Sequence, residues 1–333
     1  MAVSELGSIA EIEGWTQPKI EPLFVRMMKG LWKFTRRKPL GAVCGFIVVF
    51  FFIVGDVVPE TINKVARTAG VADHPVPYVA DQLEQAFSFI YPYSKQDLRA
   101  RLEGSSGKHL LGTDAIGRDI LSRLLYGART AVMVSFGAVA INQLIGASIG
   151  IMSGYYGGWV DKGLYRVCDV FQALPGLVVL ITVLGIFGSG LWQLVFVIGL
   201  YGGPIQSRVI RGQAVYVMAS PFIEAARVIG ASDRRIMVRY LLPNVMPLII
   251  LNATVSLGFI VLLEASLSFL GYGLPPPFPS WGQMLSLEGR QYMRTQPGLA
   301  IYPGVAIGIL VFSFNLFGDA LRDVLDPRLR GSK

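Results

Sequence analysis

Long apolar stretches constrain this 333-residue chain more than any other feature of its sequence. Each is close to the roughly 20 residues that an α-helix needs to cross the hydrocarbon core of a bilayer. The composition agrees, because 53% of the residues are apolar and 16% are charged, whereas soluble domains usually carry about 25% charged residues. The sequence therefore predicts an all-α integral membrane protein with six transmembrane helices, at about residues 39–59, 130–154, 165–187, 191–207, 245–270 and 295–318.

The segments between these stretches predict the domain organisation. Residues 1–38 become basic toward the first apolar stretch, which is typical of a cytoplasmic segment with an amphipathic elbow helix. Residues 60–129 are too long for a tight connection and are expected to form an extracytoplasmic loop. Residues 130–320 would form the core of five helices, and residues 321–333 a cytoplasmic tail. With the long loop set aside, the predicted inner segments hold 19 Lys and Arg residues against 2 outside, as the positive-inside rule requires.

A polar segment, residues 220–244, separates the fourth and fifth apolar stretches. Ser220 suits the cap of a short helix, and Pro221 suits its first position, where a missing N–H costs nothing. Gly230 can adopt the left-handed conformation that ends such a helix. These residues predict the first limb of a helical hairpin.

A second limb follows, with Ser232 as its cap and Pro243 as its expected end. The hairpin is basic, and three interpretations are open. It could be a charged interfacial loop, a helix-turn-helix for DNA, or a handle for a soluble partner. DNA binding is disfavoured because the next apolar stretch begins only a few residues away. The arginines are Arg227, Arg234, Arg235 and Arg239.

The hairpin sequence EAARVIGASDRRIMVRYLLPN, residues 224–244, resembles the EAA loop of ABC-importer permeases. Matching positions are Glu224, Ala225, Ala226, Gly230, Leu242 and Pro243. In that family the loop is a coupling helix that docks into a cleft on a cytoplasmic ATPase. The resemblance implies ATPase coupling for Glu224, Ala225, Ala226, Arg227, Gly230, Ala231, Ser232 and Asp233.

A second stretch, HLLGTDAIGRDILSRLLYGAR at residues 109–129, resembles a segment of dipeptide/oligopeptide/nickel-type permeases. It contains four charged residues at helical separations, Asp114, Arg118, Asp119 and Arg123. They could form a self-neutralising surface network. Alternatively, they could line the extracytoplasmic mouth or contact a substrate-binding protein.

Together these stretches imply a type I ABC-importer permease fold, similar to the DppC/OppC-like subunit of a peptide importer. Such a subunit forms a translocation path with a sister permease, as a heterodimer in the bacterial or archaeal cytoplasmic membrane, with both termini cytoplasmic. Two cytoplasmic ATPase subunits would bind ATP and Mg²⁺, and an extracytoplasmic binding protein would deliver the substrate. Dipeptides or oligopeptides are the expected cargo, with nickel chelates or glutathione as alternatives.

Glu264 is the ionisable residue well inside a predicted span, with Ser268 one helical turn later. An ionisable group at membrane depth suggests a translocation path, although a structural hydrogen bond explains it equally well. A self-sufficient channel or secondary transporter would show inverted repeats or several such charges, and neither pattern is visible.

Other chemistry is not indicated by the sequence. His74 and His109 are expected to be solvated, and Cys44 and Cys168 to be small buried apolar residues; neither pair has metal-site spacing. Residues 104–108, GSSGK, lack the flanking Gly and Ser/Thr of a phosphate-binding loop. We therefore expect no catalytic site, metal, cofactor or nucleic-acid partner for this chain.

Gly146, Gly150 and Gly154 form a small-residue stripe that predicts close helix packing.

Overall fold

The computed structural model describes residues 35–36, 38–52 and 93–325. The described residues from 40 onward belong to one compact unit. The predicted elbow and most of the predicted tail lie outside the described residues. In the described part all regular elements are helical, apart from one isolated bridge between Thr113 and Asp119. The all-α prediction is confirmed.

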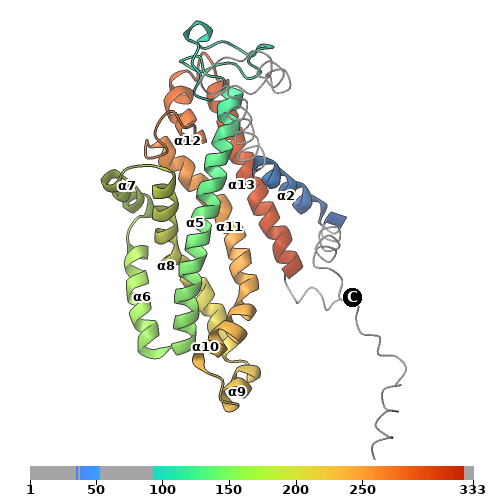
Figure 1. The fold of residues 1–333 in the computed structure, drawn as a ribbon, viewed down its shortest axis with the longest axis vertical. Helices are drawn as coiled ribbons and strands as arrows, with labels where there is room; N and C mark the ends of the chain where they lie inside the picture. Colours follow the sequence, from blue (N-terminus) through green and yellow to red (C-terminus); the bar gives the residue numbers. More distant parts are fainter. Residues whose placement is uncertain (1–34, 37, 53–92, 326–333) are drawn as a thin grey trace, which may run out of the picture. The chain divides into compact units, whose positions relative to one another are not determined.

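The helices follow one another in the order shown in Figure 1. They are α2 (Pro39–Phe52), a 3₁₀ turn (Leu98–Ala100), α5 (Ile120–Tyr156), α6 (Gly158–Ala173), α7 (Gly176–Phe187), α8 (Leu191–Met218), α9 (Pro221–Val228), α10 (Asp233–Arg235), a π-turn (Ile236–Leu241), α11 (Leu242–Phe269), α12 (Trp281–Met284), a second π-turn (Leu285–Gly289) and α13 (Gly298–Leu325).

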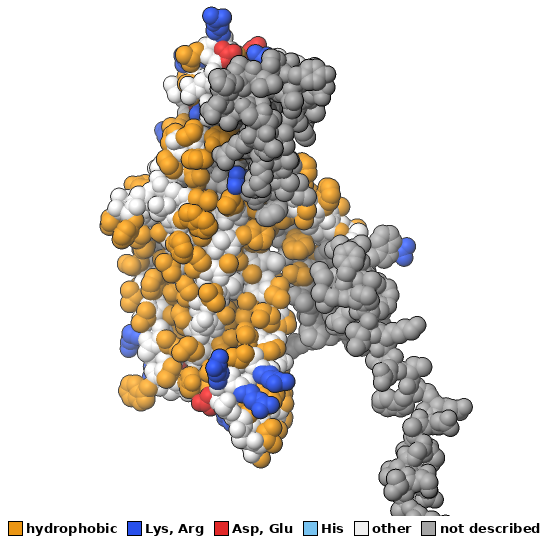
Figure 2. Space-filling view, viewed as in Figure 1, with side chains coloured by type: hydrophobic (Ala, Val, Ile, Leu, Met, Phe, Trp, Pro, Cys, Tyr) orange, Lys and Arg blue, Asp and Glu red, His pale blue; other side chains and the backbone are white. Residues whose placement is uncertain are grey.

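Three helical stretches in the described residues are long and apolar enough to cross a membrane. They are Ile120–Tyr156, Asp233–Phe269 and Gly298–Asp323, and the bent pair α6 and α7 would be a fourth if it counts as one span. Of the other two predicted spans, the one over residues 191–207 lies within α8, and the described part of the one over residues 39–59 is α2. The apolar part of α2 is described over Pro39–Phe51, and the second half of α8 carries Arg208 and Arg211. Hydrophobic side chains cover the middle of the helices on the face shown in Figure 2.

The span expected over residues 165–187 is helical but broken in the middle. α6 ends at Ala173, α7 begins at Gly176, and the chain bends by 87° between them. Pro175 causes the break, because it lacks an N–H and disfavours the helical conformation in the residue before it. Leu174 is accordingly extended, with φ −92° and ψ 137°.

The second predicted span begins ten residues earlier than expected, at Ile120 rather than at residue 130. The Asp119 carboxylate caps this start, since its Oδ2 accepts the Ser122 N–H at 2.7 Å. With 37 residues, α5 is about 55 Å long. This exceeds the roughly 40–45 Å of a bilayer with its headgroups, so α5 can reach both membrane surfaces.

The predicted glycine stripe is confirmed as the contact between α5 and α8. A Cβ atom on Gly150 would lie 2.8 Å from the Ser207 carbonyl oxygen, and one on Gly154 would lie 2.6 Å from the Ala214 Cβ. Such distances leave no space for a side chain. The two backbones therefore approach each other along the lower half of α5, beside the buried residues Ile210 and Ala214.

Candidate functional site

The hairpin, residues 220–241, connects the C-terminal end of α8 to the N-terminal end of α11 (Figure 1). Its first limb is as predicted: Ser220 precedes α9 and Pro221 is the first helical residue. Gly230 follows with φ +76°, in the left-handed region where glycine carries no Cβ penalty. Ile223 and Ala226 are buried and pack with Ile236 of the second limb, so the hairpin has a small core of its own.

The second limb differs from the prediction, because Pro243 does not end it. α10 passes through the π-turn Ile236–Leu241 directly into α11, with Pro243 in the first turn of α11. A π-turn shifts the backbone hydrogen bonds by one residue, which accommodates a proline that has no N–H to donate. The stretch from Asp233 to Phe269 is therefore continuously helical, and a displacement of the hairpin can be carried into α11.

An apolar surface covers the tip of the hairpin. Val228 and Ile229 are 87% and 77% exposed, and Phe222 is also exposed. Charged side chains gather around this end of the molecule (Figure 2). Clustered exposed apolar residues with a polar rim mark contact sites for another protein.

Of the eight predicted coupling residues, six are exposed: Glu224, Ala225, Arg227, Gly230, Ser232 and Asp233. Ala226 is buried and Ala231 is half-buried, and both pack in the hairpin core. These two alanines therefore shape the hairpin, while the exposed six can meet a partner.

Sequence reasoning missed a polar network that joins α5, α6 and α8 near the hairpin. Arg211 of α8 donates two hydrogen bonds to the Asp161 carboxylate of α6, one of them from Nε to Oδ1 at 2.7 Å. Ser153 of α5 also donates to Asp161. Tyr155 of α5 donates to the Asp233 carboxylate of the hairpin at 2.7 Å. No local pattern indicated this network, because Arg211 and Asp161 lie 50 residues apart in the sequence and Tyr155 and Asp233 lie 78 apart.

At the other end of α5, residues 93–119 form a cap in which Asp114 is the centre. Asp114 is 1% exposed, and its Oδ2 lies 2.5 Å from the Arg118 Nε and 3.6 Å from the Arg123 Nε. Arg118 also reaches Glu288 at 2.8 Å. A self-neutralising network is therefore favoured over a contact with another protein, but it is buried rather than on the surface, since Asp114 and Arg123 are 1% and 4% exposed.

Asp119 lies outside this network. It caps α5, and its Oδ1 is 2.9 Å from the Nδ1 of His109. The expectation that His109 is solvated is wrong, because its side chain is buried against Asp119. His74 lies outside the described residues.

Glu264 and Ser268 are both 1% exposed, and the Ser268 hydroxyl donates to the Glu264 carboxylate at 2.7 Å. The sequence left open whether Glu264 makes a structural hydrogen bond or lines a translocation path, and this contact with Ser268 is such a hydrogen bond. Because both side chains are enclosed by this chain, the geometry favours that role over a lining of the translocation path.

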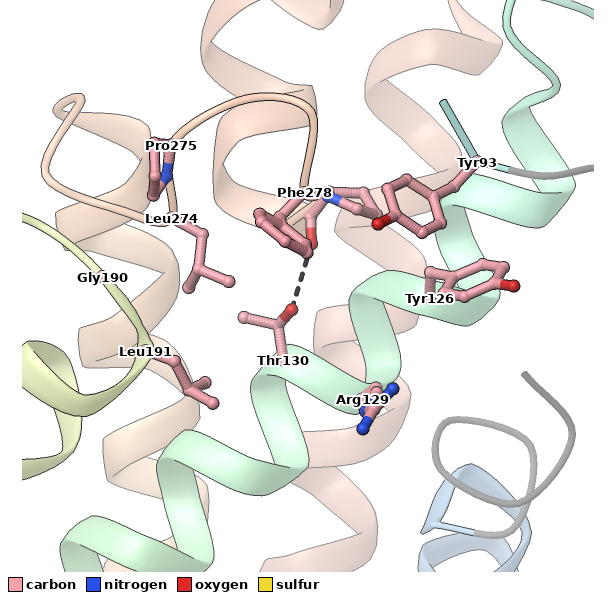
Figure 3. Close-up of a pocket in the computed structure, with 10 residues that line it drawn as sticks. Tyr93, Tyr126, Arg129, Thr130, Gly190, Leu191, Leu274, Pro275 and Phe278 are labelled. Carbon is pink, nitrogen blue, oxygen red and sulfur yellow. Dashed lines mark hydrogen bonds between the residues drawn. The ribbon is translucent and has the colours of Figure 1, made fainter. Parts of the chain in front are cut away.

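A pocket of about 390 Å³ lies between the first turns of α5, the start of α8 and the loop before α12. Tyr93 lies between Tyr126 and Phe278, with ring centroids 4.5 and 6.1 Å apart, and Thr130 donates to the Pro279 carbonyl (Figure 3). Apolar surface predominates in it, and Arg129 adds a cation. Nothing in the sequence pattern predicted this pocket.

Residues 146–331 match the family of the binding-protein-dependent transport system inner membrane component. The match spans most of the helical core, including the hairpin. It begins within α5, so the cap lies outside it.

Similar proteins of known role extend the match. The chain is 40% identical over 245 residues to the glutathione transport system permease protein GsiD of Pectobacterium atrosepticum, covering 73% of this chain and 81% of that protein. It is 42% identical over 246 residues to the Escherichia coli GsiD, with the same coverage. It is 37% identical over 238 residues to the dipeptide transport system permease protein DppC of Alkalihalophilus pseudofirmus, covering 72% and 78%.

The fold also matches a solved structure, the inward-facing MetNI methionine ABC transporter. The TM-score is 0.51 at 20% identity, covering 61% of this chain and 96% of that chain. This likeness establishes the fold alone. Together with the apolar helices, the family match and the relatives show that this chain belongs to the multi-pass, cytoplasmic-membrane permease subunits of ABC importers, which are not themselves enzymes.

Proposed function

We propose that this chain is one of two non-identical permease subunits of an ATP-driven importer for dipeptides or oligopeptides. The observation that carries the proposal is the hairpin. It presents Val228 and Ile229 to solvent and continues without a break into α11, so that a soluble motor bound there can move a membrane helix.

In this proposal the partners supply the chemistry. Two cytoplasmic ATPases bind ATP and Mg²⁺, and the exposed hairpin residues, Glu224 and Arg227 among them, contact one ATPase. A sister permease completes the path, and an extracytoplasmic binding protein delivers the cargo. Both termini would then be cytoplasmic. The complex, not this chain, would hydrolyse ATP and alternate between inward- and outward-open states.

Peptides remain the proposed cargo, with glutathione as the second candidate. The relatives include both a dipeptide permease and glutathione permeases at similar identity. Glutathione is itself a small peptide, so both cargoes have the same chemical class. No described residue of this chain distinguishes between them.

The test is reconstitution of the chain with its genomic neighbours in proteoliposomes. We expect ATPases to co-purify with the chain. Uptake of radiolabelled dipeptide or glutathione should require ATP on the side of the membrane that carries the ATPases, and the binding protein on the opposite side. Uptake by the isolated chain without an ATPase would refute the proposal. Uptake of glutathione but not of dipeptides would select the second cargo.

A further inference from the structure

Tyr155, in the last turn of α5, connects that helix to the hairpin. α8 leads into the hairpin and α11 leads out of it, so both are covalently joined to it. α5 is not adjacent to the hairpin in the sequence, yet the Tyr155 hydroxyl lies 2.7 Å from Asp233 Oδ1 at the start of the second limb. The hydroxyl is the donor, since a carboxylate accepts.

The ring of Tyr155 reinforces this connection. It packs against the hairpin core of Ile223, Ala226 and Ile236, and also against the core between α5, α8 and α11. The guanidinium of Arg227 lies 5.9 Å from the centre of the ring, within the range of a cation–π contact. Hairpin residues from both limbs therefore hold this one side chain.

We propose that Tyr155, Asp233 and Arg227 form a latch through which displacement of the hairpin is carried into α5. The inference rests on the proposed function and extends it to a helix that the hairpin does not adjoin in the sequence. The far end of α5 is held by the cap, about 55 Å away by the rise of an α-helix. The latch would thus let one hairpin movement rotate three helices together, with Tyr155 as a positioning residue. Asp233 would act within the chain as well as toward the ATPase.

The first experiment measures the latch in the purified full-length chain, in nanodiscs, by hydrogen exchange. Tyr155→Phe removes the hydroxyl and keeps the ring. We expect the hairpin amides of residues 223–236 to exchange about three-fold faster or more, because a hydrogen bond to a charged acceptor is lost. Tyr156→Phe is the matched control, since its neighbouring ring is exposed and lies edge-on to that of Tyr155. Equal exchange in the two variants would overturn the latch.

The second experiment measures coupling in the complex with ATPases, sister permease and binding protein, using the cargo found to be transported. Tyr155→Phe should retain ATPase binding and basal hydrolysis, while uptake per ATP hydrolysed falls about three-fold or more. In a double-mutant cycle with Asp233→Asn, the two losses should be less than additive. Unchanged uptake per ATP, full additivity, or loss of ATPase binding in Tyr155→Phe would each overturn the inference. If the wild-type chain binds no ATPase, the proposed function fails, whereas hydrogen exchange still decides whether the latch exists.

Discussion

Arg118 and Glu288 are 170 residues apart in the chain, yet the Arg118 Nη2 donates to the Glu288 Oε1 at 2.8 Å. The same guanidinium holds Asp114 through its Nε. This pair ties the cap to the π-turn before α13, and a bond from Arg101 to Tyr292 adds a second tie to the same connection. The cap thus closes the end of the bundle opposite the hairpin.

Substitution Glu288→Gln tests the electrostatics of this pair through pH. Burial raises the pKa of the Glu288 carboxyl above its ordinary 4.5, and Asp114 acts in the same direction, against Arg118 and Arg123. A carboxyl whose folded pKa is raised binds its proton more tightly in the native state. Its contribution to stability is therefore greatest at low pH, and falls as the pH rises from about 4.5 through the raised value.

We expect the melting temperature of the wild-type chain in nanodiscs to fall relative to that of Glu288→Gln across this window. Above the window the difference should become constant. A difference that moves in the opposite direction would show that the arginines outweigh burial at this site.

Gly127→Ala tests the packing of α12 on α5. Trp281 is 1% exposed and donates its indole N–H to the Leu124 carbonyl at 2.8 Å. A Cβ on Gly127 would lie 2.7 Å from the Trp281 Cδ1. We expect a lower melting temperature, because overpacking costs typically about 1–3 kcal/mol. Gly163→Ala in α6 is the control, since nothing lies within 4 Å of its Cβ position; it should be neutral or stabilising. Equal effects would contradict the close contact.

Much of the fold could be predicted because its signals are local. Apolar length indicated where the helices lie, and the spacing of Gly146, Gly150 and Gly154 indicated which face of α5 packs closely. The hairpin was predictable because Pro221 and Gly230 act on their own backbone. The resemblance added the expectation that the hairpin contacts an ATPase.

The remaining features depend on partners distant in sequence. No local pattern shows that His109 is buried against Asp119, because the two side chains meet only when the cap folds. Pro243 marks a helix end by the usual rule, and a π-turn is what lets the helix continue. Arg211 meets Asp161 across 50 residues, and Tyr155 meets Asp233 across 78, so neither pair could be read from spacing.

Gly230→Val tests the geometry of the hairpin. Gly230 has φ +76° and open space around its Cβ position, so the penalty is backbone strain rather than a clash. Holding an L-residue there costs roughly 1–2 kcal/mol, about a 5–30-fold change in the population of the native bend. We expect uptake to be abolished or reduced by about that factor, with membrane insertion intact. Gly212→Val is the control, as that glycine lies in α8 with nothing within 4 Å. Wild-type uptake and transport-coupled ATP hydrolysis in Gly230→Val would contradict this prediction.

Glu224→Lys tests the proposed docking surface. Glu224 is exposed in the first turn of α9, where the helix dipole favours a negative charge by about 0.3–1 kcal/mol. Reversal of that charge weakens the helix start only slightly, so a large effect must arise from contact with the ATPase. We expect uptake to be lost and ATPase co-purification to fall, while the hairpin amides of the isolated chain keep most of their protection from exchange. The matched control is Glu103→Lys, which makes the same charge change on an exposed residue of the cap. If Glu103→Lys releases the ATPase as readily as Glu224→Lys does, the effect is one of net charge. That result would contradict the proposal that the hairpin is the docking surface.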